Sequence, residues 1–285
     1  MNSGKVAGAA LDVFESEPPG VCRLFELSRL ICTPHLGAST QEAQTKVAVD
    51  VAGQIIDYLK NGTVLNAVNV PSVTGDILKK LNPLLTLGNQ MGSLQAQLSN
   101  GAVKEVVIEY AGDFKGLDLS PVSIAVLRGL LTHMVKDDVN FVNAQVLAKE
   151  RGIKVTEATS DDSGEYINLI TVRVETTEMI NTVTGTIFGK NELRIVKINN
   201  FRLELIPNGH ISLIYNFDKP GAIGSFATLL GKNNINIDQM QVGQEEGGEL
   251  NIIFLKTNVS LPSHVVEEMH QLKLVKTVTP LEFDI

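Results

Sequence analysis

Three titratable side chains near the start of the chain have the types and spacing that acid–base chemistry requires. An almost unbroken apolar run, residues 6–14, contains Asp12 and is followed by Glu17, and a shorter run, residues 30–32, is followed by His35. A glutamate beside a histidine holds the imidazole in one tautomer and raises its pKa, so that the ring donates a proton near neutral pH. These residues favour a general acid at His35, oriented by Glu17.

A histidine that follows a proline also has a simpler interpretation, because such residues are often loop residues or helix-cap partners. Spacing alone favours that interpretation for His35. The predicted strands that carry these residues support the catalytic interpretation instead. Continuous apolar runs are typical of strands in a parallel sheet that is covered on both faces, where ligands bind beyond the carboxyl ends of the strands. We therefore expect the polar residues that end the two runs to face one crevice.

The motifs GAALDVF at residues 8–14, Glu17-Pro18, and TPHLGAST at residues 33–40 resemble the signature of the D-2-hydroxyacid dehydrogenases and, among these, of the D-3-phosphoglycerate dehydrogenases. The resemblance implies NAD as cofactor and oxidation of 3-phosphoglycerate to 3-phosphohydroxypyruvate in L-serine biosynthesis. It implies that Glu17 pairs with His35 and that His35 exchanges a proton with the substrate oxygen. Asp12, His35 and Gly37 are then the cofactor-side residues, with Asp12 facing the nicotinamide carboxamide.

Two parts of the family's pattern are not found in this sequence. No Gly-x-Gly-x-x-Gly follows any apolar run, and no arginine precedes the motif that contains Asp12. We therefore interpret the chain as resembling the carboxyl-terminal half of such an enzyme. We expect it to be inactive in isolation, because the pyrophosphate-binding turn and the substrate-binding arginine are not found.

The composition of the chain argues against several classes of binding partner. The chain has 285 residues, enough for two or three domains, and carries 24 Lys and Arg against 32 Asp and Glu. A net charge of −8 without a basic block argues against nucleic acid or an anionic membrane as a partner. Cys22 and Cys32 have no metal-ligand spacing, so we expect no metal site and a reducing, cytoplasmic compartment.

The remaining pattern divides the chain into three parts. Residues 1–70 are expected to be the α/β end of the catalytic region, closing with a helix that starts at a capping box, Ser39 to Glu42, and stops near Gly62. An extended segment, residues 64–70, and a linker, residues 71–75, should follow. Residues 75–206 read as an α+β domain that resembles the intervening regulatory domain of the longer phosphoglycerate dehydrogenases.

The elements expected in the middle part are mixed helices and strands. They are a helix over 77–98 with breaks at Pro83 and Gly88, a strand over 103–110, helices over 121–134 and 140–151, a strand over 154–159, and β-rich runs over 166–175, 182–188 and 192–206. Four cations in the last of these runs and just before it are a candidate anion pocket for a phosphate: Lys190, Arg194, Lys197 and Arg202. The interpretation we favour is that they are the solvated face of an edge strand.

Residues 210–285 show the order βαββαβ, which predicts a four-stranded antiparallel, ferredoxin-like sheet with two helices on one face. The motif DKPGAIG at residues 218–224 resembles an ACT domain, a module that binds amino acids. Resemblance to serine-binding members implies Asn216, Asp218 and Asn236 as effector contacts and L-serine as the effector. Ordinary turn chemistry also explains these residues, and ligand binding is the reading we favour. The open sheet edges predict a homo-oligomer.

Two rival functions remain open. One is a regulatory module that senses an amino acid and has no catalysis of its own. The other is a different D-2-hydroxyacid dehydrogenase, because the motif around His35 is shared across substrates, although the ACT-like stretch weighs against it.

Overall fold

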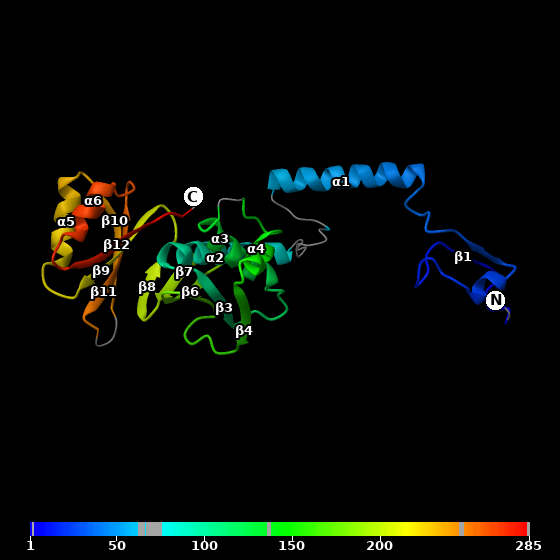
Figure 1. Cartoon of the computed structure of the whole chain (residues 1–285), viewed down its shortest axis with the longest axis horizontal. Helices are drawn as coiled ribbons and strands as arrows, with labels where there is room; N and C mark the ends of the chain where they lie inside the picture. Colours follow the sequence, from blue (N-terminus) through cyan, green and yellow to red (C-terminus); the bar gives the residue numbers. More distant parts are fainter. Residues whose placement is uncertain (2, 62–65, 67–75, 136–137, 245–247, 284–285) are drawn as a thin grey trace. The chain divides into compact units, whose positions relative to one another are not determined.

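The computed structural model of the chain describes every residue except 2, 62–65, 67–75, 136–137, 245–247 and 284–285 (Figure 1). The chain divides into two compact units, residues 1–67 and residues 68–285. The first unit contains Asp12, Glu17 and His35. The second contains a middle module and a C-terminal module, each built on its own sheet. None of the described helices combines the length and hydropathy of a membrane span.

The first unit has a two-stranded parallel sheet. Strand β1 (Ala9–Leu11) pairs with β2 (Leu30–Cys32), a 3-10 helix η1 (Arg23–Glu26) lies between them in sequence, and α1 (Gln41–Asn61) follows. The predicted extent of the strand over 6–14 is wrong, because β1 has three residues. Val6 and Val13 are 45% and 56% exposed. Within the described part of the chain, β2 is the only strand that pairs with β1.

Helix α1 starts one residue later than the predicted capping box implies. The Thr40 hydroxyl, not that of Ser39, accepts a hydrogen bond from the N–H of Ala43 at 3.2 Å. The apolar positions that recur every four residues on this helix are exposed in the described unit: Val47, Val51, Ile55 and Leu59. The predicted C-cap at Gly62 and the linker over 71–75 lie outside the described residues, as does the segment over 64–70 apart from residue 66.

The middle module is a six-stranded sheet with the order β4-β3-β5-β6-β7-β8, in which only β3 and β4 are parallel. Its strands are β3 (Val103–Gly112), β4 (Lys154–Ser160), β5 (Asn168–Thr176), β6 (Ile180–Phe188), β7 (Glu192–Ile198) and β8 (Phe201–Leu205). Its helices are α2 (Asp76–Leu98), α3 (Ser120–Thr132) and α4 (Ala144–Glu150). Strand residues such as Val106 and Val172 share one core with Leu87 of α2 and Leu127 of α3. The predicted α+β architecture is confirmed.

Two predicted breaks in α2 are wrong, since the helix runs through both Pro83 and Gly88. The glycines of α2 are packing positions. A Cβ added at Gly88 would lie 3.0 Å from the carbonyl oxygen of Val122, and one added at Gly92 would overlap the carbonyl oxygen of Val126. The absence of these side chains lets the backbones of α2 and α3 approach each other closely.

The β-rich run over 192–206 is a hairpin of β7 and β8. Strand β7 turns into β8 at Asn199, whose φ of 52° is a left-handed conformation that asparagine tolerates better than most residues. This turn places Lys197 directly opposite Arg202.

The C-terminal module follows the predicted βαββαβ order: β9 (His210–Phe217), α5 (Ala222–Lys232), β10 (Ile237–Gln244), β11 (Leu250–Thr257), α6 (Ser263–His270) and β12 (Val275–Leu281). The strands pair antiparallel in the order β10-β11-β9-β12. One face packs Ile214 and Ile253 against Phe226 of α5 and Met269 of α6. The other face contributes residues such as Leu213 and Phe254 to the core of the middle module, so the sheet is covered on both sides.

Candidate functional sites

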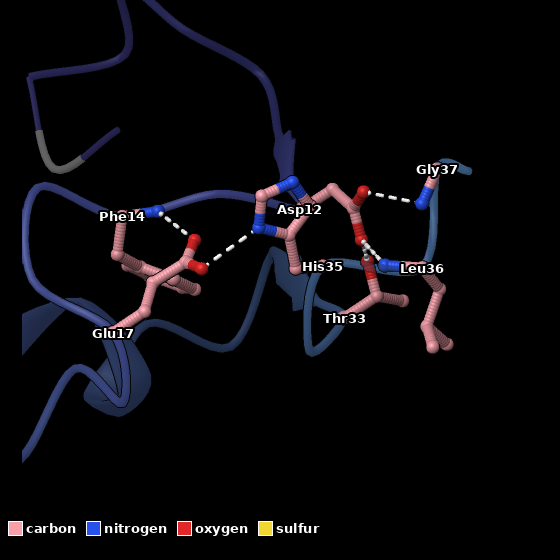
Figure 2. A network of polar contacts seen from close by, with 7 residues as sticks. All are labelled: Asp12, Phe14, Glu17, Thr33, His35, Leu36 and Gly37. Carbon is pink, nitrogen blue, oxygen red and sulfur yellow. Dashed lines mark hydrogen bonds and ion pairs between the residues drawn. The ribbon is translucent and has the colours of Figure 1, made fainter. Parts of the chain in front are cut away.

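Figure 2 shows Glu17 and His35 joined in the first unit. Glu17 Oε2 lies 2.7 Å from His35 Nδ1, and Glu17 Oε1 accepts a hydrogen bond from the N–H of Phe14 at 3.0 Å. His35 follows β2 with a left-handed backbone, φ 54°, and its N–H donates to the carbonyl oxygen of Asp12 at 2.9 Å. These bonds bring together two loops that are separated by 18 residues in sequence.

The electrostatics of the pair suit proton transfer. The hydrogen bond and the charge of Glu17 raise the pKa of His35 above its ordinary value of 6.5. The hydrogen bond from His35 lowers the pKa of Glu17. The His35 side chain is 60% exposed, and its second ring nitrogen points away from Glu17 (Figure 2). Because Glu17 engages Nδ1, Nε2 is the ring nitrogen that remains available for proton exchange.

Asp12 braces the loop that carries His35. Its carboxylate accepts hydrogen bonds from the hydroxyl of Thr33, from the N–H of Leu36 at 2.7 Å and from the N–H of Gly37 at 2.7 Å. The Thr33 and Leu36 bonds hold the pKa of Asp12 below its ordinary value. A Cβ at Gly37 would lie 3.0 Å from Asp12 Oδ2, so this position favours glycine. The structure therefore brings together the sequence-predicted residues of this site: Asp12, Glu17, His35 and Gly37.

An apolar pocket of about 330 Å³ adjoins the pair. Its lining includes Glu17, His35, Cys32 and the edge-to-face ring pair of Phe14 and Phe25, whose centroids are 5.7 Å apart. Phe25 and Thr33 were not among the predicted site residues. Phe25 is positioned by η1, and the sequence has no periodic pattern that predicts this short helix. Thr33 lies inside the motif that the sequence analysis identified.

The residues present fit one end of an NAD molecule. The pocket is apolar, is lined by the rings of Phe14 and Phe25 and adjoins His35, which suits a nicotinamide ring rather than a charged diphosphate. The sequence contains no Gly-rich turn for the diphosphate. No group of three or more His, Cys, Asp or Glu side chains in the described part of the chain has an arrangement that would hold a metal ion.

The predicted effector residues lie in two places. Asn216 is 2% exposed near the end of β9, and its Oδ1 has no hydrogen-bond partner among the described residues. Asp218 follows β9, and its Oδ1 accepts a hydrogen bond from Asn251 at 2.8 Å. Asn236 precedes β10, where its amide donates to Asp238 at 2.7 Å. The structure therefore brings Asn216 and Asp218 together, with Asn251 as a residue that sequence reasoning missed, and places Asn236 at the far end of the sheet.

A pocket of about 540 Å³ lies beside the first of these places. Lys219 and Lys273 line it from two loops, together with Pro220, Ser225 and the neighbouring leucines. The loop before β12 is tied to β9 because the N–H of Phe217 donates to the carbonyl oxygen of Leu274 at 2.9 Å. Two lysine side chains in one pocket lining favour an anionic group such as a carboxylate.

The four cations of the candidate anion pocket do not converge on one point. Arg194 donates to Glu192 at 2.9 Å and stacks on the ring of Phe188, with 5.6 Å to the centroid. Lys197 and Arg202 lie opposite each other on β7 and β8 and are both exposed, and Lys190 is exposed near the tip of the hairpin between β6 and β7. The side chain of Arg194 is only 17% exposed, whereas Lys190, Lys197 and Arg202 are exposed. The solvated-face interpretation therefore fits these three residues, of which Lys197 and Arg202 form an adjacent cation pair.

Three family models match parts of the chain. Residues 1–37 match the NAD-binding domain of the D-isomer specific 2-hydroxyacid dehydrogenases, residues 80–199 match the D-3-phosphoglycerate dehydrogenase intervening domain, and residues 211–274 match the ACT domain. Only a small part of the NAD-binding domain is thus present. The candidate active site lies in the first match and the candidate effector residues lie in the third.

Curated proteins give the same picture. The chain is 40% identical over 269 residues to the D-3-phosphoglycerate dehydrogenase of Bacillus subtilis, covering 94% of this chain and 51% of the relative. It is 38% identical over 270 residues to that of Synechocystis, with 94% and 49% covered, and 36% identical over 285 residues to that of Archaeoglobus fulgidus, with 99% and 54% covered. The chain thus spans about half the length of the curated relatives it matches. The chain belongs to the D-3-phosphoglycerate dehydrogenase family and carries the end of its NAD-binding domain, its intervening domain and its ACT domain.

Proposed function

We propose that this chain is the part of an NAD-dependent, cytoplasmic D-3-phosphoglycerate dehydrogenase that supplies the acid/base group and the regulatory domains. The division we propose is residues 1–70 for the catalytic end, 75–206 for the intervening domain and 210–285 for the ACT domain. The observation that carries the catalytic half is the 2.7 Å contact between His35 Nδ1 and Glu17 Oε2 beside an apolar pocket.

The residues of this chain perform the proton half of the reaction. When 3-phosphoglycerate is oxidised, neutral His35 takes the hydroxyl proton at Nε2, and the resulting imidazolium is stabilised by Glu17 at Nδ1. A bound NAD supplies the acceptor for the hydride. In the reverse direction protonated His35 returns the proton to the keto oxygen. Asp12 keeps the loop in place throughout by holding the N–H groups of Leu36 and Gly37.

A chimera tests this function. The part of the Bacillus subtilis relative that is not aligned with this chain is joined ahead of residue 1, and NADH formation is followed with D-3-phosphoglycerate, D-lactate and D-glycerate. We expect oxidation of D-3-phosphoglycerate, because the joined part would supply the cofactor- and substrate-binding residues while this chain supplies His35 and Glu17. D-lactate and D-glycerate are the controls for substrate-independent NADH formation. A chimera that binds NAD and D-3-phosphoglycerate but forms no NADH would contradict the proposed role of this chain. The unjoined chain should give no NADH, because it has no Gly-rich turn to hold the cofactor's diphosphate.

We propose further that the C-terminal module binds L-serine as a feedback effector. Asn216 Oδ1 is buried and lacks a partner in the described residues, so it offers an acceptor to an ammonium group, while Lys219 and Lys273 offer cations to a carboxylate. Because Asn236 lies at the opposite end of the sheet, the proposed site takes Asn236 from a second copy. A homo-oligomer is therefore part of the proposal.

The same observation at Asn216 favours the second candidate function, an amino-acid sensor without catalysis. Calorimetric titration of the whole chain with L-serine, beside the Asp218→Ala variant, tests the sensor half. We expect binding by the wild type and at least about tenfold weaker binding by the variant, because Asp218 is held in place by Asn251 next to Asn216. Equal heats for the two proteins, or none for either, would remove serine binding from both functions. Dehydrogenase activity of the chimera separates the two functions from each other.

A further inference from the structure

The side-chain amide of Gln97 forms two hydrogen bonds with the backbone of Glu282, one through its oxygen and one through its nitrogen. The N–H of Glu282 donates to Gln97 Oε1 at 2.7 Å, and Gln97 Nε2 donates to the carbonyl oxygen of Glu282 at 2.8 Å. Gln97 lies in the last turn of α2, in the middle module, and Glu282 directly follows β12 of the C-terminal module. A paired contact of this kind fixes both the position and the direction of the chain segment it holds.

Two further side chains orient Gln97. Its Nε2 also donates to the hydroxyl of Ser93 at 3.1 Å, and that hydroxyl lies 2.7 Å from Nε2 of His133, the residue that caps the end of α3. Ser93 is 9% exposed. The amide of Gln97 is therefore held by groups from both α2 and α3, which are themselves packed backbone to backbone at Gly92.

Packing secures the same segment. Leu281 and Phe283, on either side of Glu282, are 3% and 7% exposed and belong to the core that the two modules share. The contact with Gln97 therefore holds backbone at the C-terminal end of β12 that is also packed into the core on both sides of Glu282.

The other end of β12 lies at the candidate effector site. Val275 is opposite Asn216 in the sheet, and Lys273 and Leu274, just before the strand, line the pocket beside that site. One strand of seven residues, about 20 Å long, therefore joins the candidate effector site to α2. Gln241 of β10 makes a second glutamine contact between the modules, but with one hydrogen bond instead of two: its Oε1 accepts the N–H of Glu204 at 2.9 Å.

We propose that Gln97 is a positioning residue that couples the candidate effector site to the middle module by clamping the end of β12 onto α2. A ligand that orders the Val275 end of β12 then also orders the last turn of α2. The effector half of this inference rests on the proposed binding of L-serine, whereas the clamp itself is independent of any ligand.

Amide hydrogen exchange of the whole chain, read by mass spectrometry, tests the clamp first without ligand. The variants are Gln97→Ala and Gln97→Met, the second of which keeps the length and helix propensity of the side chain. The control is Gln241→Ala, which removes the other glutamine contact. Loss of two or three net hydrogen bonds should speed exchange over residues 275–283 by about 10- to 100-fold in both Gln97 variants. The control should leave exchange there unchanged. Unchanged exchange over 275–283 in the Gln97 variants, or an equal increase in the control, would overturn the clamp.

The same measurement with L-serine tests the coupling. In the wild type, serine should slow exchange over residues 275–281 and over residues 93–98. In the Gln97 variants, serine should still bind with an affinity within about threefold of the wild type and slow exchange near residue 275, without any effect on residues 93–98. A response of residues 93–98 that survives in both variants would overturn the coupling. If the wild type binds no serine, the proposed effector function fails, while the ligand-free comparison still decides the clamp.

Discussion

Asn216 and Asn236 lie at opposite ends of the same four-stranded sheet. Asn216 pairs with Asn251, which pairs with Gln244 at the far end of β10 from Asn236. Ile237, the neighbour of Asn236, is seven residues from Gln244, so about 23 Å of strand separates the two asparagines. One copy of the chain cannot present both side chains to a molecule the size of serine.

The first prediction follows from that separation. Asn216→Ala and Asn236→Ala should each abolish serine binding when measured alone, because each removes one contact from every site of a two-fold dimer. A mixture of the two variants should regain about a quarter of the wild-type sites, since half of the dimers are mixed and each mixed dimer has one intact site. Calorimetry of the refolded mixture measures this fraction.

The oligomeric state is the control for this experiment. A sedimentation run at tens of micromolar, an order-of-magnitude choice for a weak dimer, should show the wild type and both variants as dimers or larger. A monomer that binds serine with full affinity, or a mixture that binds no better than its components, would exclude a shared site.

The second prediction concerns pH. Glu17 raises the pKa of His35, and the neutral ring is the form that accepts a proton during oxidation. Oxidation of 3-phosphoglycerate by the chimera should therefore rise with pH through the pKa of His35, and reduction should fall through the same value. Glu17→Gln keeps a hydrogen-bond acceptor but removes the charge, which lowers the pKa of His35. The pH profiles of oxidation and of reduction should therefore both move to lower pH. Profiles of kcat/KM that coincide for the two proteins would show that Glu17 does not set the charge of His35.

The third prediction tests the contact between α2 and α3. Gly92→Ala should lower the free energy of unfolding by about 2–3 kcal/mol, because the new Cβ overlaps the carbonyl oxygen of Val126 and forces the two helices apart. Gly231→Ala in α5 is the matched control, since no atom lies within 4 Å of its added Cβ. The control should change stability by less than about 1 kcal/mol, toward stabilisation. Urea unfolding measures both, and an equal effect of the two substitutions would contradict the packing.

The fourth prediction concerns the first unit in the isolated chain. Its sheet consists of two three-residue strands, and apolar side chains such as Val13 and Ile31 are exposed, so little burial stabilises it. Trypsin should cut after Arg23 and Arg29 at least about tenfold faster than after Arg128 and Arg173, which lie in a helix and a strand of the middle module. Protection of the first forty residues would show that the unit is stable without further strands.

The sequence predicts the C-terminal module well because its signals are local. Alternating strands, the glycine at the start of α5 and the short turns all act over a few residues, and the βαββαβ order follows from them. The pairing of Glu17 with His35 was also predicted, through the motif that carries both residues.

The failures share a physical cause, which is dependence on distant neighbours. Pro83 and Gly88 end helices in isolation, but in α2 the packing of Gly88 and Gly92 against α3 outweighs that tendency. The apolar run over 6–14 indicates burial, although burial also requires strands and helices that the described residues do not supply. The separation of Asn216 from Asn236 depends on strand direction. Strands β9 and β10 are both antiparallel to β11, so the end of β9 and the start of β10 lie at opposite ends of the sheet, which the short motifs around the two asparagines do not encode.

The most direct test of the proposed function compares the chimera that carries His35 with its His35→Asn variant. Asparagine keeps a polar side chain of similar reach and tolerates the left-handed backbone at this position, but it cannot accept the substrate proton. NADH formation from D-3-phosphoglycerate should fall by about 10²- to 10⁴-fold in kcat, with the same unfolding midpoint. A His35→Asn chimera that oxidises D-3-phosphoglycerate at the rate of its parent would contradict the assignment of His35 as the acid/base group.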